Sequence, residues 1–119
     1  MLKEKITAFI EMIRSIDGVA ACALVSRDGI IAGRSFDRDL NEPWFGALSA
    51  TILASAESVG SIIKMKSLQS VVIRAHESSI LVMGAGDNFL IVAIITDKAD
   101  SEMVHTQMLA VAQKIGEAI

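Results

Sequence analysis

The side chains best suited to catalysis or metal binding are few in this chain and lie far apart in sequence. The two histidines are His76, in a predicted turn, and His105, in a predicted helix. Neither has a cysteine or a carboxylate at a spacing typical of a metal site. Both are expected to be surface or partly hydrogen-bonded histidines, and no metal or other cofactor is predicted.

The single cysteine, Cys22, stands between Ala21 and Ala23 in a predicted apolar strand. A reactive thiol needs surroundings that stabilise the thiolate, whereas a thiol among apolar groups is inert. We therefore predict a buried, unreactive thiol. One cysteine cannot form an internal disulfide and is typical of a reducing compartment, so a cytoplasmic location is expected.

Two further patterns resemble catalytic motifs but lack the context that those motifs need. The stretch from Gly84 to Asp87 lies between two predicted strands, whereas a phosphate-binding glycine loop leads into a helix. We interpret it as a hairpin turn, and the chain has no Walker motif for GTP. The serines of the long central helix have no Gly-x-Ser-x-Gly elbow and no histidine placed as a base. The chain is predicted not to be an enzyme.

Four arginines are candidates for polar contact with a partner. An arginine can reach a nucleotide bound to another protein and stabilise phosphoryl transfer. Nothing in the sequence singles one of them out, and ordinary solvated charge is the simpler interpretation. They are Arg27, Arg34, Arg38 and Arg74.

Length and composition restrict the class of protein. The 119 residues suggest one domain over residues 1–119. Hydrophobic residues make up 52% of the chain, which favours burial of further apolar surface in an oligomer. A net charge of −3 with scattered Lys and Arg argues against nucleic-acid binding. The N-terminus does not resemble a signal peptide, and no uninterrupted apolar run approaches the roughly 20 residues of a membrane span, so no membrane insertion is expected.

Hydrophobic periodicity and turn residues predict the order helix, two strands, helix, three strands, helix. Short turns between consecutive strands imply hairpins and an antiparallel sheet. Three amphipathic helices must cover its faces, which predicts an α/β/α sandwich. Helices are expected over residues 2–16, 41–64 and from 101 onward, and strands over residues 19–25, 30–35, 68–75, 79–85 and 89–96.

The helix over residues 41–64 carries two apolar stripes, although covering a sheet needs only one. The first stripe is expected to face the sheet and comprises Phe45, Leu48, Ile52, Ala56, Val59 and Ile63. The second has small residues in its middle, which suits close packing against a helix of another chain, and comprises Trp44, Ala47, Thr51, Ala54, Ser58 and Ile62. The alternative, a helix buried on all sides within its own domain, is rare at this size. On the remaining face, the candidates for contact with a further protein partner are Gly46, Leu53, Glu57 and Lys64.

Several landmarks together resemble one known family. They are Ile16-Asp17-Gly18-Val19, the segment from Leu24 to Gly29 through the first hairpin, the Ala/Ser-rich helix from Pro43, Ile80-Leu81-Val82-Met83 and Leu90-Ile91-Val92. In order and spacing they resemble the roadblock/dynein light-chain family, in its short, stand-alone prokaryotic form. The resemblance implies a profilin-like sheet of five antiparallel strands in the spatial order 2-1-5-4-3.

The same resemblance implies homodimers or heterodimers that pair through the third strand and pack their long second helices together. Here the interface would combine the second stripe with Leu68, Val71, Val72 and Ile73, a strand whose edge has no proline or bulge to guard it. The family implies a non-enzymatic regulator or scaffold of a Ras-like small GTPase, acting through the paired second helices. The alternatives are a structural dynein-type light chain or adaptor and a small-ligand sensor, against which the low aromatic content of 4% argues.

Overall fold

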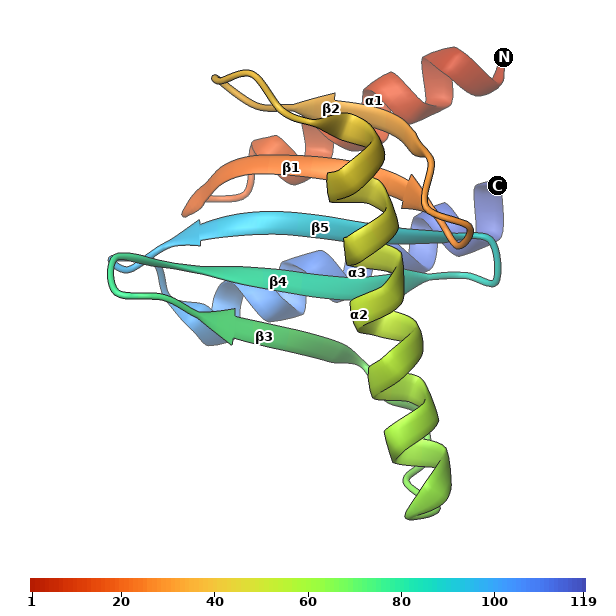
Figure 1. Ribbon diagram of the computed structural model, residues 1–119. Coiled ribbons are helices and arrows are strands. Elements are labelled where there is room, and N and C mark those ends of the chain that lie inside the picture. The colour runs from red at the N-terminus through yellow and green to blue at the C-terminus, as the bar shows by residue number, and fades with distance from the viewer.

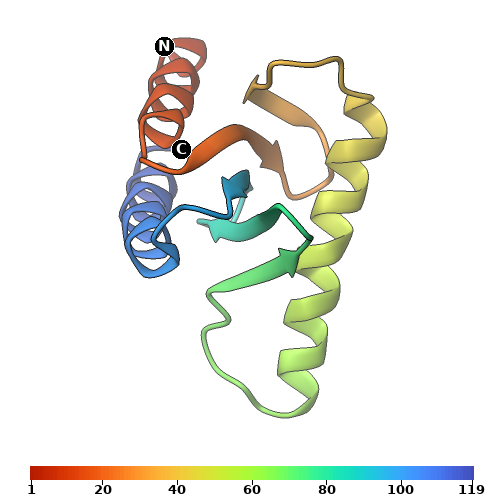
Figure 2. The same cartoon turned by 90° about the vertical axis from the view of Figure 1, so that its left-hand side faces the viewer.

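The computed structural model describes all 119 residues and contains the predicted elements in the predicted order. The five strands form one antiparallel sheet in the order β2-β1-β5-β4-β3. Helices α1 and α3 lie on one face of this sheet and α2 lies on the other (Figure 1, Figure 2). The α/β/α sandwich and the strand order 2-1-5-4-3 are therefore confirmed. The elements are α1 (Leu2–Arg14), β1 (Val19–Ser26), β2 (Ile31–Ser35), α2 (Glu42–Ile62), β3 (Ser70–Arg74), β4 (Ser78–Ala85), β5 (Phe89–Thr96) and α3 (Ser101–Ala118).

Capping residues define where the last two helices begin. The side chain of Asn41 accepts a hydrogen bond from the backbone N–H of Trp44 at 3.3 Å, and Pro43 occupies the first turn of α2. Asp100 accepts from the N–H of Met103 at 3.2 Å at the start of α3. Both side chains satisfy a backbone donor that the first helical turn leaves free.

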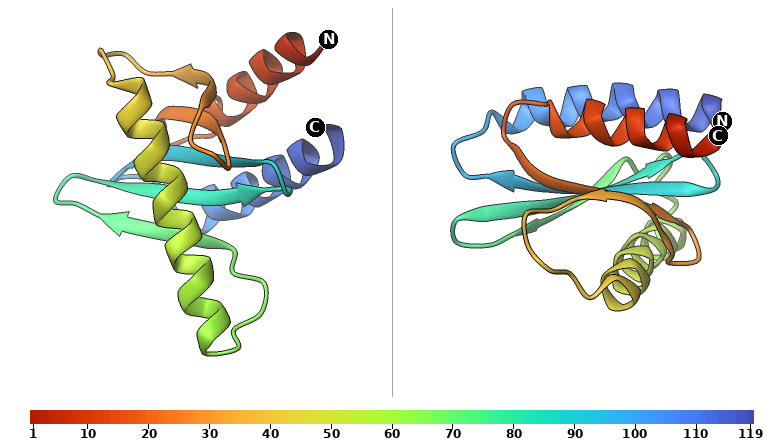
Figure 3. Two further views of the ribbon diagram at one scale, coloured as in Figure 1. Left: turned by 45° about the vertical axis from the view of Figure 1, so that its right-hand side comes forward. Right: turned by 90° about the horizontal axis from the view of Figure 1, so that it is seen from above.

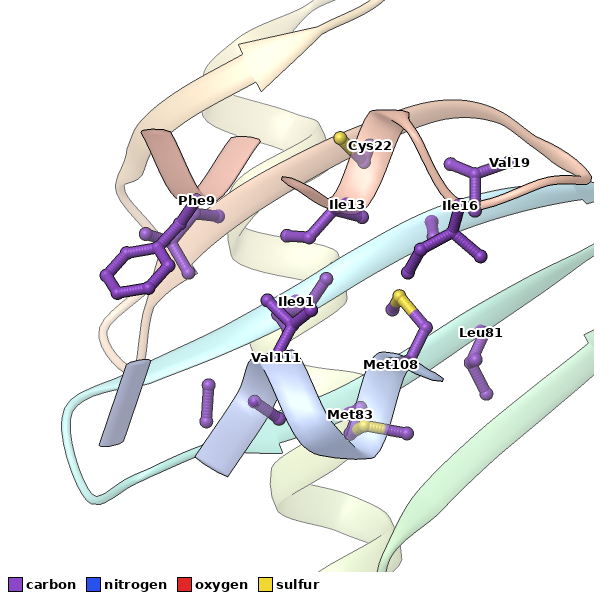
Figure 4. Close-up of a cluster of buried hydrophobic side chains, with 14 of the residues drawn as sticks. Phe9, Ile13, Ile16, Val19, Cys22, Leu81, Met83, Ile91, Met108 and Val111 are labelled. Carbon is purple, nitrogen blue, oxygen red and sulfur yellow. The ribbon is translucent and has the colours of Figure 1, made fainter. Parts of the chain in front are cut away.

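The face of the sheet covered by α1 and α3 holds the larger core. The two helices lie side by side above the sheet (Figure 3). Their apolar stripes meet the sheet in one cluster of 18 buried residues, among them Ile13, Cys22 and Met108, which are fully buried. Figure 4 shows these side chains filling the space between the helices and the strands.

The opposite face is covered by α2 alone. This helix runs across the strands, and its C-terminal end extends beyond β3 (Figure 1, Figure 2). Its contact with the sheet forms a smaller cluster of seven buried residues, to which α2 contributes only Ala50 and Leu53. One face of the sheet is thus covered by two helices and a large core, and the other by one helix and a smaller core.

The side of α2 that faces the sheet differs from the prediction. The predicted sheet-facing stripe is only partly covered, since three members are half-buried, namely Phe45, Ile52 and Ala56, but Leu48, Val59 and Ile63 are 54%, 60% and 63% exposed. The helix is rotated from its predicted position by about one residue, or roughly 100°. The residues of α2 that are buried are Gly46, Ser49, Ala50, Leu53 and Gly60.

Close backbone packing explains the rotation. A Cβ atom added to Gly46 would overlap the carbonyl oxygen of Gly29, and one added to Gly29 would lie 3.0 Å from the Cα of Ala47. The turn between β1 and β2 therefore touches the backbone of α2 directly. Gly29 has a φ of 95°, a conformation that glycine adopts without strain. Counting hydrophobic residues along the helix cannot reveal such a contact.

By length and composition alone, α2 is also apolar enough to cross a membrane, although polar residues interrupt its apolar sequence. This is weak support for a membrane span, because a helix that covers the core of a globular domain meets the same criterion. In the structure α2 packs on the sheet through Ala50 and Leu53. The absence of membrane insertion stays a prediction.

Candidate partner-binding surface

The exposed large apolar side chains gather on α2 and at its C-terminal end. Besides Leu48, Val59 and Ile63, they include Trp44, Ile62 and Met65. An extended apolar surface on a domain whose core is otherwise well packed indicates a site of contact with a partner. All members of the predicted second stripe are exposed and available for such contact, namely Trp44, Ala47, Thr51, Ala54, Ser58 and Ile62.

The edge strand β3 borders this surface. It pairs only with β4, so its outer edge has no hydrogen-bonding neighbour. The pairing with β4 runs without a bulge from Ser70 to Arg74. Of the residues predicted for the dimer interface, Leu68 and Val71 are half-buried against the smaller core, whereas Val72 and Ile73 are exposed. The strand therefore offers an unprotected edge of the kind that adds a further strand.

The last turn of α2 projects past this same edge (Figure 1). Lys64 ends the helix with a left-handed backbone conformation (φ 60°), and the N–H of Met65 donates to the carbonyl oxygen of Gly60 at 2.8 Å. This closing turn leaves Ile62, Ile63 and Met65 exposed beyond the chain's own sheet. The structure thus places an unprotected strand and an apolar helix end next to each other.

The third face of α2 corrects part of the prediction. Gly46 and Leu53 are buried against the sheet, so they are not available to a further partner. The reason is the rotation of the helix, which turns this face inward. Glu57 lies at the margin and is bound to Arg27, while Lys64 is exposed where the helix ends.

Arg27 is held by three elements and is not the solvated charge that the sequence suggested. Its Nε donates to the carbonyl oxygen of Phe89 at 3.1 Å and its Nη2 donates to that of Gly86 at 2.9 Å. Its Nη1 lies 3.1 and 3.2 Å from the two carboxylate oxygens of Glu57 on α2. The guanidinium group therefore joins the end of β1, the β4–β5 turn and α2. Because these residues are distant in sequence, no local pattern could have indicated the contact.

The other arginines differ in their contacts. The Nε of Arg34 lies 3.3 Å from Glu42 in the first turn of α2, and both side chains are partly exposed. Arg38 and Arg74 form no ion pair and are exposed, as predicted for solvated charge. The structure therefore distinguishes the four arginines by their contacts and singles out none of them for contact with a nucleotide.

The residues with potential chemistry take structural roles. The Nε2 of His105 lies 2.9 Å from the hydroxyl oxygen of Ser70, which ties α3 to the edge strand β3. His76 is exposed in the β3–β4 turn. No three His, Cys, Asp or Glu side chains are grouped so that they could hold a metal ion. The stretch from Gly84 to Asp87 ends β4 and begins a hairpin turn, as predicted.

Cys22 is fully buried in the larger core, where its thiol contacts the carbonyl oxygen of Ile10 at 3.8 Å. Burial raises the pKa of this thiol to about 11, and the positive charge of Arg14 opposes part of that rise. A thiol with so high a pKa stays protonated at neutral pH and is a poor nucleophile. The prediction that Cys22 is buried is confirmed, and the raised pKa agrees with the predicted unreactive thiol.

A hollow between β3 and α3 is lined by Val72, Arg74, Val104 and His105 among others and has a volume of about 50 Å³. Pockets for small organic ligands are typically about 300–1,000 Å³. This hollow is therefore too small for such a ligand. A second hollow between α1 and β2, lined by Ile6, Ile10 and Gly33 among others, has a volume of about 460 Å³, so the sensor alternative stays an alternative.

Comparison with known proteins agrees with the fold and the family resemblance. The model of the Roadblock/LC7 domain family matches residues 7–95. A comparison with curated protein sequences finds no match. Among solved structures, MglB of Myxococcus xanthus is similar with a TM-score of 0.86 and 13% identity, covering 95% of this chain and 93% of that chain. The gliding protein MglB from Thermus thermophilus has a TM-score of 0.84 and 15% identity, covering 97% and 88%.

A more distant likeness extends beyond roadblock proteins. Profilin II of Acanthamoeba castellanii has a TM-score of 0.65 and 16% identity, covering 94% of this chain and 98% of that chain. At such identities these likenesses show the shared fold, and the predicted profilin-like sheet is confirmed.

Proposed function

Because the chain belongs to the Roadblock/LC7 domain family, we propose that it is a non-enzymatic, cytoplasmic regulator or scaffold of a Ras-like small GTPase and that it works as a homodimer. The observation that carries this proposal is the exposed apolar side of α2 beside the unprotected edge of β3. Soluble domains rarely leave both features uncovered, because each promotes association.

A second copy of the chain would cover both features through one symmetric contact. Two β3 strands pairing edge to edge would place each sheet beneath the projecting end of the other copy's α2. The exposed Ile62, Ile63 and Met65 of each chain would then rest on the partner. A two-fold contact of this kind uses the same surface on both subunits and closes the assembly at two copies.

The paired helices would present a broad surface to a GTPase. Trp44, Thr51, Ser58 and Ile62 are assigned to the contact between the two copies, which leaves the neighbouring side of each α2 for a further protein. Of the residues predicted for contact with this further protein, Glu57 and Lys64 are exposed. Support for a GTPase as that protein comes from family membership, since fold alone does not determine function.

A pull-down from the native lysate tests the GTPase assignment. The tagged chain, sized beforehand, is incubated with a non-hydrolysable GTP analogue or with GDP, and bound proteins are identified by mass spectrometry. We expect a dimeric bait that enriches a Ras-like GTPase in one nucleotide state. A dimeric bait that captures no GTPase in either state would overturn the proposed regulator, and capture of a motor subunit would favour the light-chain alternative.

A further inference from the structure

We infer that Arg27 is a positioning residue that sets the rotation of α2 about its axis and so determines which side of the helix a partner meets. The inference rests on the proposed use of the exposed side of α2 for partner contact. It follows from three observations, namely how Arg27 is held, where α2 is attached, and which residues the attachment leaves outside.

The guanidinium group of Arg27 is fixed before it reaches α2. Two of its nitrogens donate to backbone carbonyls, at 3.1 Å to Phe89 and at 2.9 Å to Gly86. Gly84 leaves room for it, because a Cβ at that position would lie 2.7 Å from Nη2. These contacts fix the orientation of the planar guanidinium group. Its Nη1 is therefore directed at both carboxylate oxygens of Glu57.

The same turn of the chain attaches α2 at two places. Gly29 packs against the helix backbone at Gly46 and Ala47, and Arg27 holds Glu57 further along. Gly46 and Glu57 are eleven residues apart, about 16 Å along a helix. A helix held at one point can turn about its axis, whereas a second contact on the same side of the helix prevents this rotation.

The attachment works against the hydrophobic pattern of the helix. A rotation of about 100° would turn Leu48 and Val59 to the side of α2 that faces the sheet, which is the arrangement that periodicity favours. In the structure both side chains are more than half exposed, whereas Phe45 and Ile52 of the same stripe are half-buried against the smaller core. Contacts at Glu57 and Gly46 therefore keep Leu48 and Val59 out of the chain's own core and available to a partner.

Thiol labelling of a Cys introduced at Ala50 tests this inference in the full chain. Ala50 faces the sheet and is 9% exposed, and the native Cys22 is fully buried and reports any global opening. In the Arg27→Met background we expect labelling at residue 50 to rise about two- to fivefold, the factor for loss of a partly exposed ion pair with α2. Labelling of Cys22 should not change, and a thiol introduced at Val59 should label more slowly at concentrations below the self-association midpoint.

Arg34→Met is the matched control, since Arg34 also pairs with α2, through Glu42, and has a similar exposure. It is expected to leave labelling at residue 50 unchanged. Unchanged labelling at residue 50 in Arg27→Met, or faster labelling at residues 50 and 59 together, would overturn the inference. If Arg27→Met opens the whole domain and exposes Cys22, Glu57→Met decides, because it keeps both carbonyl bonds of Arg27 and removes the acceptor on α2. A rise at residue 50 in Glu57→Met supports rotation, and no rise overturns it.

The readout separates this inference from the proposed function. A wild-type chain that stays monomeric at every concentration would contradict the dimer, yet labelling at residue 50 would still report the rotation of α2. Conversely, an unchanged pattern in Arg27→Met would leave the dimer and the GTPase proposal standing.

Discussion

The two faces of the sheet bury their helices in different ways. On the face with α1 and α3, each helix packs through its apolar side, and Val104, Met108 and Ile115 of α3 are all buried. On the other face, α2 turns Gly46, Ser49 and Leu53 inward and leaves Trp44, Leu48 and Val59 more than half exposed. A helix that packs only within its own chain turns its most apolar side to the core, whereas a helix that must also meet a partner need not.

The largest effect is expected from truncation in the better-covered face. Ile115 is fully buried in α3, so Ile115→Ala should lower the free energy of unfolding by about 2–5 kcal/mol. Val59 on α2 is 60% exposed, and Val59→Ala should stay within about 0.5 kcal/mol at concentrations where the chain is monomeric. Urea denaturation measures both. Equal losses would mean that α2 buries its apolar stripe in solution.

The pKa of the Cys22 thiol reports how well the larger core excludes water. The unfolded thiol ionises near pH 9.0, whereas the folded thiol keeps its proton until about pH 11. Because the folded state binds more protons in this window, stability should fall as pH rises. At about 1.4 kcal/mol per unit of pKa, the free energy of unfolding should fall by about 2–3 kcal/mol across this window. The difference in the free energy of unfolding between the wild type and Cys22→Ala, followed by denaturation from pH 8 to pH 11, separates the effect of the thiol from that of lysine titration. A constant difference would contradict the buried thiol.

Glycine substitutions distinguish the two ends of α2. Gly46→Ala should destabilise the domain by about 1–3 kcal/mol, since the new Cβ would overlap the Gly29 carbonyl. Gly60→Ala meets nothing closer than 3.7 Å and should stabilise by about 0.5–1 kcal/mol through helix propensity. Thermal unfolding of both variants checks the opposite signs. Stabilisation by Gly46→Ala would show that the helix does not rest on the β1–β2 turn.

Ala54→Glu should change stability least. Ala54 is exposed, so the domain should stay within about 0.5 kcal/mol of the wild type. Self-association should weaken at least about tenfold, because the two-fold contact would bury two like charges. Sedimentation equilibrium and thermal unfolding provide the two readouts. A folded variant that dimerises like the wild type would remove Ala54 from the interface.

The sequence allowed most of the fold to be predicted. Periodicity located all three helices, turn residues located the hairpins, and the family resemblance supplied the strand order. The rotation of α2 could not be predicted, because it depends on the approach of Gly46 to Gly29 and on the Arg27–Glu57 pair. Residues 17 and 30 positions apart carry no local signal of such contacts.

For the same reason, only part of the candidate surface was predicted correctly. The stripe from Trp44 to Ile62 is exposed, as a partner contact requires, but Leu48, Val59 and Ile63 were assigned to the core and lie outside. Hydrophobicity indicates that a residue tends to be buried. It does not indicate whether the residue is buried in the core of its own chain or against a partner chain. Val59→Glu, which the stripe assignment would expect to unfold the domain, is instead expected to leave it folded.

Hydrogen–deuterium exchange over a dilution series tests the central claim most directly, because it reports each segment of the wild-type chain. If copies join through α2 and β3, protection of residues 59–74 should rise with protein concentration, while α1 and β2 exchange at a constant rate. Protection that does not depend on concentration, or that rises at α1 and β2 instead, would contradict the account.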